Sequence, residues 1–345
     1  MGLDQCVLDV RKEKISVDQL KASLDCTHLN GREYMYPCLH PDYPPNYAIS
    51  DNSMFVFSSP KGMLVLLLYV DDILLTGSSS SLIDSLITSL KQEFAMKELG
   101  ELGYFLRIEA VRGPDSIVLT LQYLTITKPD ICFGVNYVSQ FMHSPSDIHL
   151  QLVKKILRYL KGTIGLGITL KKDSLQHLKA YTDSDWVGYP DTRRSTSGYA
   201  VFLGNNLVSW STKKKTIVSK FSAEAEYKCM SVAFGELKWL VDMLSELHVS
   251  VETPTLLLCD NTSVLSFASN PVFHARTKHI EIQYHTIREL VEQGFLRLQH
   301  IASEDQITDI FTKGLCFPSF FKLLQSLMGV QLQGISFGTS AEITS

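Results

Sequence analysis

Two adjacent carboxylates, Asp71 and Asp72, stand between two apolar runs of the chain, at residues 63–68 and 73–75. Apolar runs of this length are typical of buried strands, so the pair is expected at the tip of a β-hairpin. Carboxylate oxygens suit magnesium, and metal ions held in this way can catalyse phosphoryl transfer. Aspartate is also common in tight turns, so the pair alone leaves both interpretations open.

A second set of acids lies in the C-terminal half of the chain. Asp183 ends a predicted strand at 178–183, and Asp260 follows a short apolar strand at 256–259. If these strands are adjacent and parallel, both side chains emerge at the sheet edge where α/β proteins usually bind ligands. Asp185 is a less favoured substitute for Asp183, two residues on and on the same face of the strand.

Glu226 and Asp309 complete this set. Glu226 falls in the first turns of a helix predicted at 222–247, and Asp309 lies on the last predicted helix, at 304–312. Four carboxylates around one point repel each other unless cations hold them, so this set predicts two bound Mg²⁺ or Mn²⁺ ions and phosphodiester hydrolysis. Each acid alone also has an ordinary explanation, as a turn residue, a helix-start acid or a surface group.

Two clusters of basic side chains could contact a nucleic-acid backbone, although a solvated loop is the commoner role for such runs. His279 and His285 are six residues apart and do not share a helix face, which argues against zinc. The nucleic-acid-binding candidates are Lys213, Lys214 and Lys215, and Arg276, Lys278 and His279.

The spacing of apolar residues predicts the elements that must position these groups. In the first half these are a strand at 53–57, the hairpin at 64–76, a helix at 81–94, strands at 99–109 and 116–121, and helices at 130–141 and 149–160. In the second half they are strands at 178–183, 198–204 and 207–212, the helix at 222–247, the strand at 256–259, helices at 261–268 and 280–292, a strand at 295–301, and the helix at 304–312. This order predicts a mixed sheet flanked by helices.

Composition narrows the class of protein. A net charge of −4 argues against a protein that binds nucleic acid by electrostatic attraction alone, but it is compatible with an enzyme that uses metal ions at the phosphate. The seven cysteines include no C-x-x-C pair, which indicates a reducing compartment. No apolar run is long enough to span a bilayer and the N-terminus has no signal pattern, so an intracellular location, cytoplasmic or nuclear, without membrane association is expected.

Several long motifs follow one another along the chain: YVDD at 69–72, MKELGELGYFL at 96–106, YTDSDW at 181–186, RRSTSG at 193–198, SAEAEY at 222–227, CDN at 259–261, TKHI at 277–280 and EDQITDIFTK at 304–313. In this fixed order they resemble the Pol polyproteins of copia-type retrotransposons, in which a reverse transcriptase precedes a ribonuclease H. The resemblance extends from about residue 50 onward and implies that Asp183, Glu226, Asp260 and Asp309 are nuclease carboxylates and that Asp71 and Asp72 are polymerase carboxylates.

The polymerase half departs from the family pattern. A third metal-binding aspartate is expected within a segment like L-D-V-K-x-x-F-L-N-G, and the shortened SLDCTHLNG at 23–31 makes Asp25 the candidate. The expected L-Y-G-L-K-Q segment does not follow, and a second gap falls at 121–123. The resemblance therefore implies a polymerase palm remnant with two internal deletions.

The predicted fold class is α+β and α/β: a truncated reverse-transcriptase palm followed by a ribonuclease H-like mixed sheet flanked by helices. The predicted division is a degenerate segment at 1–50, the palm remnant at 51–122, a connection at 123–175, the ribonuclease H-like domain at 176–320 and a tail at 321–345. The favoured function is metal-dependent cleavage of RNA in RNA–DNA hybrids, beside a defective polymerase. Two alternatives are a polymerase fragment that needs other segments of the parent polyprotein, and an inactive relic that only binds nucleic acid.

Overall fold

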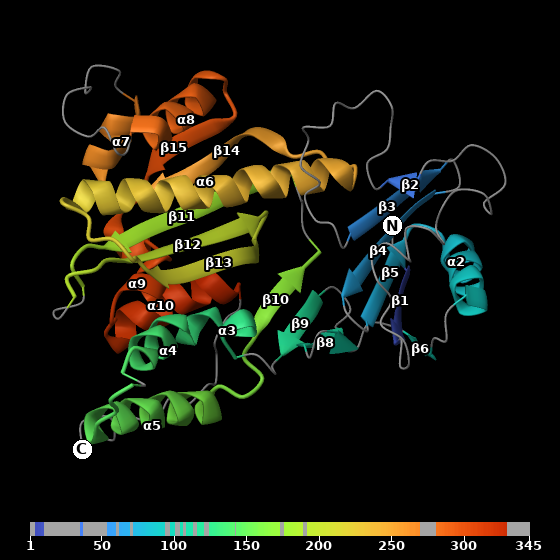
Figure 1. Ribbon diagram of the computed structural model, residues 1–345, viewed down its shortest axis with the longest axis horizontal. Coiled ribbons are helices and arrows are strands. Elements are labelled where there is room, and N and C mark those ends of the chain that lie inside the picture. The colour runs from blue at the N-terminus through green and yellow to red at the C-terminus, as the bar shows by residue number, and fades with distance from the viewer. Residues whose placement is uncertain are drawn as a thin grey trace. The chain divides into compact units, whose positions relative to one another are not determined.

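The computed structural model describes the following residues: 4–9, 35–36, 54–59, 62–69, 72–93, 97–100, 104–105, 108–112, 116–120, 124–141, 143–172, 176–188, 192–269 and 281–329. The chain divides into two compact units, one of residues 1–110 with 242–249 and one of residues 111–241 with 250–345 (Figure 1). No helix in these described ranges is long and apolar enough to cross a membrane.

The first unit contains a six-stranded sheet in the order β2-β3-β4-β5-β1-β6. The predicted hairpin is present, because β4 and β5 pair antiparallel with Tyr69 opposite Asp72, while Val70 and Asp71 lie outside the described residues. The elements are β1 (Asp4–Asp9), β2 (Met35–Tyr36), β3 (Met54–Ser59), β4 (Gly62–Tyr69), β5 (Asp72–Gly77), α2 (Ser80–Glu93) and β6 (Lys97–Gly100).

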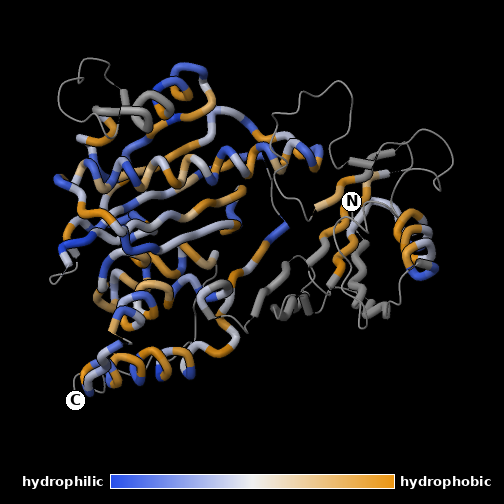
Figure 2. The backbone as a smooth tube through the Cα atoms, in the orientation of Figure 1, coloured by the Kyte–Doolittle hydropathy of each residue, from blue (hydrophilic) through white to orange (hydrophobic). Residues whose placement is uncertain are grey.

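Apolar side chains at strand and helix spacing explain these elements. Ile73 and Leu75 of β5 are fully buried, and Leu66 in the middle of β4 is 1% exposed. Helix α2 buries Ile83 and Leu90, which recur at helical spacing on one face. Figure 2 shows the same concentration of apolar residues along β4, β5 and one side of α2.

The segment between the two main sheets differs from expectation. The range predicted as one strand, 99–109, contains described parts of three strands, and Phe105 of the second pairs antiparallel with Ile108 of the third. Strand β10 was not predicted; it pairs antiparallel with β9. The predicted helices are present, and Tyr159 of α5 donates a 2.5 Å hydrogen bond to Asp130 before α4. The elements are β7 (Tyr104–Phe105), β8 (Ile108–Arg112), β9 (Ser116–Thr120), α3 (Leu124–Thr127), η1 (Pro129–Ile131), α4 (Cys132–Ser139), α5 (Asp147–Gly162) and β10 (Ile168–Lys171).

The second unit is built on a five-stranded mixed sheet in the order β13-β12-β11-β14-β15. The first three strands form an antiparallel meander, whereas β14 runs parallel to β11 and β15 runs parallel to β14. The condition stated for the acidic set, that its two strands be adjacent and parallel, is therefore met. The strands are β11 (His177–Asp185), β12 (Thr196–Leu203), β13 (Asn206–Lys214), β14 (Glu252–Cys259) and β15 (Leu296–His300).

Helices cover both faces of this sheet (Figure 1). The long helix α6 (Ser222–Glu246) lies along one face and buries Ala225, Met230 and Leu237 completely. On the other face, Ala200 and Phe202 join a core cluster with α9 (Asp309–Thr312) and α10 (Phe317–Met328). Helices α7 (Thr262–Ser269) and α8 (Glu281–Glu292) lie between β14 and β15 in the chain.

The helix predicted at 304–312 is not continuous. It is divided into η2 (Ser303–Asp305) and α9 by the buried residue Gln306, whose side-chain amide donates a 3.0 Å hydrogen bond to the carbonyl of Thr182 in β11. After this break α9 packs against β11 and β12. Helix α10, which follows, was not predicted.

Candidate metal centre

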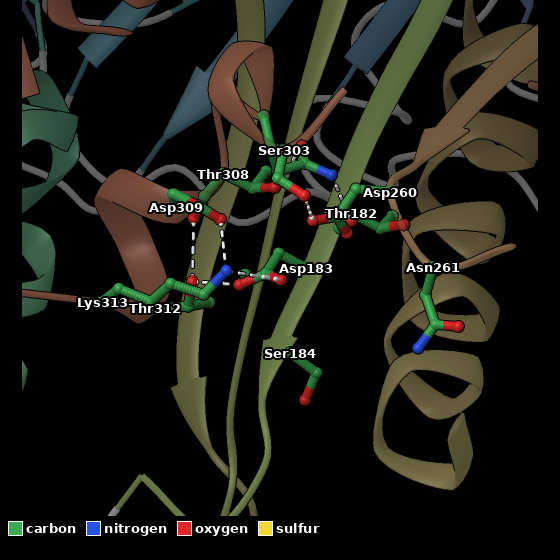
Figure 3. Close-up of polar contacts among 12 residues, drawn as sticks. Thr182, Asp183, Ser184, Asp260, Asn261, Ser303, Thr308, Asp309, Thr312 and Lys313 are labelled. Carbon is green, nitrogen blue, oxygen red and sulfur yellow. Dashed lines mark hydrogen bonds and ion pairs between the residues drawn. The ribbon is translucent and has the colours of Figure 1, made fainter. Parts of the chain in front are cut away.

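Asp183 lies near the end of β11, where strand alternation directs it toward α9. It is 2% exposed and stands directly opposite Gly198 of β12. Its carboxylate accepts a hydrogen bond from the hydroxyl of Thr312 (Figure 3). It also forms an ion pair with Lys313, whose Nζ is 3.3 Å away. Burial raises the pKa of Asp183, with a further contribution from Asp260, while Lys313 and Thr312 act in the opposite direction.

Three of the four predicted nuclease acids come together. Asp183, Glu226 and Asp260 offer carboxylate oxygens that all lie within 4.8 Å of one another. They come from β11, the second turn of α6 and the residue directly after β14. Because β11 and β14 are parallel neighbours, their carboxyl ends meet at one sheet edge, and α6 brings Glu226 to the same point.

Glu226 is the most buried member of this group after Asp183, and one of its oxygens lacks a partner. Its side chain is 6% exposed, and its Oε2 atom is buried without a hydrogen-bond partner. Burial, with added repulsion from Asp183 and Asp260, raises the pKa of Glu226 to about 9. A buried carboxylate oxygen without a partner is costly, and a divalent ion would satisfy it.

Asp309 is connected to this group through a lysine. Its carboxylate forms a 2.7 Å ion pair with Lys313, and the same lysine also forms an ion pair with Asp183. Burial raises the pKa of Asp309 to about 6 despite the nearby ammonium group. Asp185, the predicted substitute, is half-buried, and the group of three that could share an ion contains Asp183 and not Asp185.

The donor set fits Mg²⁺ or Mn²⁺. All the converging atoms are carboxylate oxygens, which these hard cations prefer, and their mutual repulsion requires positive charge nearby. The unpartnered Oε2 of Glu226 is an oxygen that such an ion could accept as a ligand.

Sequence reasoning missed the residues that orient these acids. Ser303 of η2 donates a 2.9 Å hydrogen bond to Asp260, and Thr312 bonds Asp183. Thr312 and Lys313 follow Asp309 at a spacing of three and four residues, which places all three on one side of a short helix. That spacing was the available signal; the contact of Ser303 had none, because it depends on how η2 docks beside β14.

The acids of the hairpin are only partly described. Asp72 begins β5, while Asp71 and the candidate Asp25 lie outside the described residues. The backbone register places Asp9, the last residue of β1, directly opposite Asp72. Asp9 belongs to Leu8-Asp9-Val10, which matches the start of the expected L-D-V-K segment, so this motif was the missed signal and Asp9 is a second candidate beside Asp25.

The structure describes one of the two predicted basic clusters. Lys213, Lys214 and Lys215, at the end of β13, line a cavity of about 250 Å³ together with Tyr199 of β12. Lys214 donates a hydrogen bond to Gln140, and burial lowers the pKa of Lys215. The second cluster, Arg276, Lys278 and His279, lies outside the described residues.

Comparison with known proteins identifies the family. Residues 42–128 match a family model described as reverse transcriptase (RNA-dependent DNA polymerase). The chain belongs to the family of copia-type retrotransposon Pol polyproteins. It is 39% identical over 323 residues to the retrovirus-related Pol polyprotein from transposon RE1 of Arabidopsis thaliana, a match that covers 79% of this chain and 22% of that protein.

A further relative and a solved structure are similar to parts of this chain. The uncharacterized mitochondrial protein AtMg00810 of Arabidopsis thaliana is 40% identical over 225 residues, covering 51% of this chain and 94% of that protein. The crystal structure of LC11-RNase H1 in complex with RNA/DNA hybrid aligns with a TM-score of 0.31 and 16% identity, covering 39% of this chain and 93% of that chain. The predicted fold class is confirmed by the chain itself, whose second unit has a mixed sheet with helices on both faces. The chain spans about a fifth of the length of the RE1 and RE2 polyproteins.

Proposed function

We propose that the second unit is a metal-dependent nuclease that hydrolyses the RNA strand of RNA–DNA hybrids. The observation that carries this proposal is the convergence of Asp183, Glu226 and Asp260 within 4.8 Å, together with the unpartnered buried oxygen of Glu226. A pair of divalent ions, when bound, supplies the charge that activates water and stabilises the leaving oxygen. No side chain needs to form a covalent intermediate.

The chain's own residues hold and orient this centre. Asp183, Glu226 and Asp260 would bind one ion, and Thr312 and Ser303 hold Asp183 and Asp260 in place through their hydroxyl groups. Without a cation Glu226 keeps its proton at neutral pH, because its pKa is raised to about 9. Cation binding must therefore release that proton, which makes the loaded site depend on pH.

The basic cavity at the end of β13 supports a nucleic-acid substrate. Lys213 is exposed and Lys215 is half-buried, and their ammonium groups can meet phosphates of a backbone. A hybrid would be selected by its backbone shape and its 2′-hydroxyl groups rather than by base edges. The substrate is therefore an RNA–DNA hybrid of any sequence.

The test is cleavage of a hybrid with an end-labelled RNA strand by the whole purified chain in Mg²⁺ or Mn²⁺. We expect cleavage by the wild type, none by Asp260→Asn, and unchanged cleavage by Asp147→Asn, which alters an exposed acid at the start of α5. Cleavage that persists in Asp260→Asn refutes the metal-site assignment. Hybrid binding without cleavage by the folded wild type would favour the inactive relic instead.

Polymerisation is a second candidate, because β1 places Asp9 opposite Asp72 beside the hairpin. This is a backbone observation, and the polymerase half would still need the segments that present primer and nucleotide. We expect no primer extension by the whole chain on an RNA template. Extension that is lost in Asp72→Asn would show that the hairpin is active.

A further inference from the structure

Lys313 occupies an unusual position at the candidate metal centre. It follows α9, and its Nζ lies 2.7 Å from Asp309 Oδ1 and 3.3 Å from Asp183 Oδ1 (Figure 3). The two carboxylates come from a helix and a strand more than a hundred residues apart in the chain. A single ammonium group therefore bridges one member of the group of three, Asp183, and the fourth acid, Asp309, which lies outside that group.

This bridge shares Asp183 with the group of three acids. Asp183 is shared between the group of three and the bridge, so an ion held by Asp183 and Asp309 would neighbour an ion held by Asp183, Glu226 and Asp260. The ammonium carries a single charge, whereas the four acids can carry four. Carboxylates around such a position attract a divalent ion more strongly than a monovalent one.

The lysine side chain is able to leave. It is 36% exposed, whereas the side chain of Asp183 is 3% exposed and that of Asp309 is 12% exposed. Lysine carries its charge on a flexible four-carbon stem and is strongly hydrated, so it can exchange a carboxylate partner for water. The acids, in contrast, are held by β11 and by α9, which packs into the core through Phe311.

We propose that Lys313 is an internal cation that fills the second metal position and must be displaced when the second divalent ion binds. Lys313 is thus a positioning residue that weakens the second ion's binding and keeps Asp183 and Asp309 together while that ion is absent. The first ion, at Asp183, Glu226 and Asp260, is little affected. This inference rests on the proposed function, because it takes the acidic group to be a two-ion centre.

The experiment is calorimetric titration of Mn²⁺ into the metal-free whole chain. The variant is Lys313→Met, and the matched control is Lys322→Met, which removes an ammonium 2.7 Å from Asp305 in a more exposed ion pair outside the acidic group. We expect the weaker of two binding events to tighten on the order of tenfold in Lys313→Met, the size of a typical coupling between sites. The stronger event and both events of Lys322→Met should be unchanged.

A second variant separates charge from packing. Lys313→Arg keeps the positive charge, so its weaker event should remain at least as weak as in the wild type. Loss of the ammonium will also leave the acids repelling one another, so metal-free Lys313→Met should unfold at lower temperature and regain stability as Mn²⁺ is added. This thermal readout still reports ion binding if Lys313→Met is partly unfolded without metal.

The inference is overturned if the weaker event in Lys313→Met is unchanged, weakened or absent, or if Lys313→Arg tightens it as much as Lys313→Met. These outcomes do not depend on catalysis. If Mn²⁺ binding changes as expected but the wild type does not cleave a hybrid, the proposed function fails and the role of Lys313 stands. If the hybrid is cleaved while the titrations are identical, the role of Lys313 fails alone.

Discussion

Gly198→Ala should destabilise the second unit because it adds a methyl group where α9 meets β12. Gly198 pairs with Asp183 on one side and with Thr212 on the other, so its position in the sheet is held by both neighbouring strands. A Cβ atom at this residue would lie 2.7 Å from the Cβ of Phe311 and 3.0 Å from the Cγ2 of Thr312. Both contacts are with α9, which carries Thr312, a hydrogen-bond partner of Asp183.

The size of the effect follows from these distances. Ordinary contact begins near 3.4 Å, so the Cβ of Phe311 at 2.7 Å must move by the difference, 0.7 Å, or more. Phe311 is fully buried, and such overpacking typically costs about 1–3 kcal/mol. Alanine also lowers the conformational entropy of the unfolded chain, which offsets about 0.4–1 kcal/mol of the packing cost. A net loss of about 1–2 kcal/mol corresponds to a decrease in Tm of roughly 2–8 °C in a domain of this size.

Gly235→Ala is the matched control. Gly235 is exposed in the middle of α6, and a Cβ there would meet no atom within 4 Å. Alanine should stabilise this helix by about 0.5–1 kcal/mol. Thermal unfolding of both variants and the wild type, followed by circular dichroism with a metal chelator present, gives the comparison. The reasoning is refuted if Gly198→Ala unfolds at or above the wild-type temperature, or if both substitutions shift Tm in the same direction.

Two further predictions concern the acidic group. The metal-free protein should lose stability as the pH rises from about 5 to 8. The folded-state pKa of Glu226 is about 9 against an ordinary 4.5, so the folded state holds a proton that the unfolded chain releases. The loss is at most about 1.4 kcal/mol per pH unit, and Glu226→Gln should flatten it in urea unfolding with a chelator; an equal slope in both proteins would contradict this. Thr312→Val removes the hydroxyl that bonds Asp183 while keeping its shape, and calorimetry should show weaker Mn²⁺ binding by a few-fold, on the order of one hydrogen bond of about 1 kcal/mol. Unchanged affinity would mean that Thr312 does not position the carboxylate.

The local elements could be predicted because they depend on patterns within short stretches of chain. The alternation of apolar residues identified β11, β12 and β13, and helical spacing identified α6, with errors of only a few residues at the ends. The same patterns placed Asp183, Glu226 and Asp260 at the ends of elements that converge. The break at Gln306 could not be predicted, because the preference of this residue for a buried bond to β11 depends on the finished fold.

The sequence by itself determined the family and most of the helices and strands of the second unit, and it named the candidate acids, since these depend on residue types and their spacing. Only the tertiary structure decided which groups touch. It placed β14 parallel to β11, set Asp9 opposite Asp72, and brought Lys313 between Asp183 and Asp309. Each of these contacts joins segments that are far apart in the chain. Local sequence patterns do not specify which distant segments pack together.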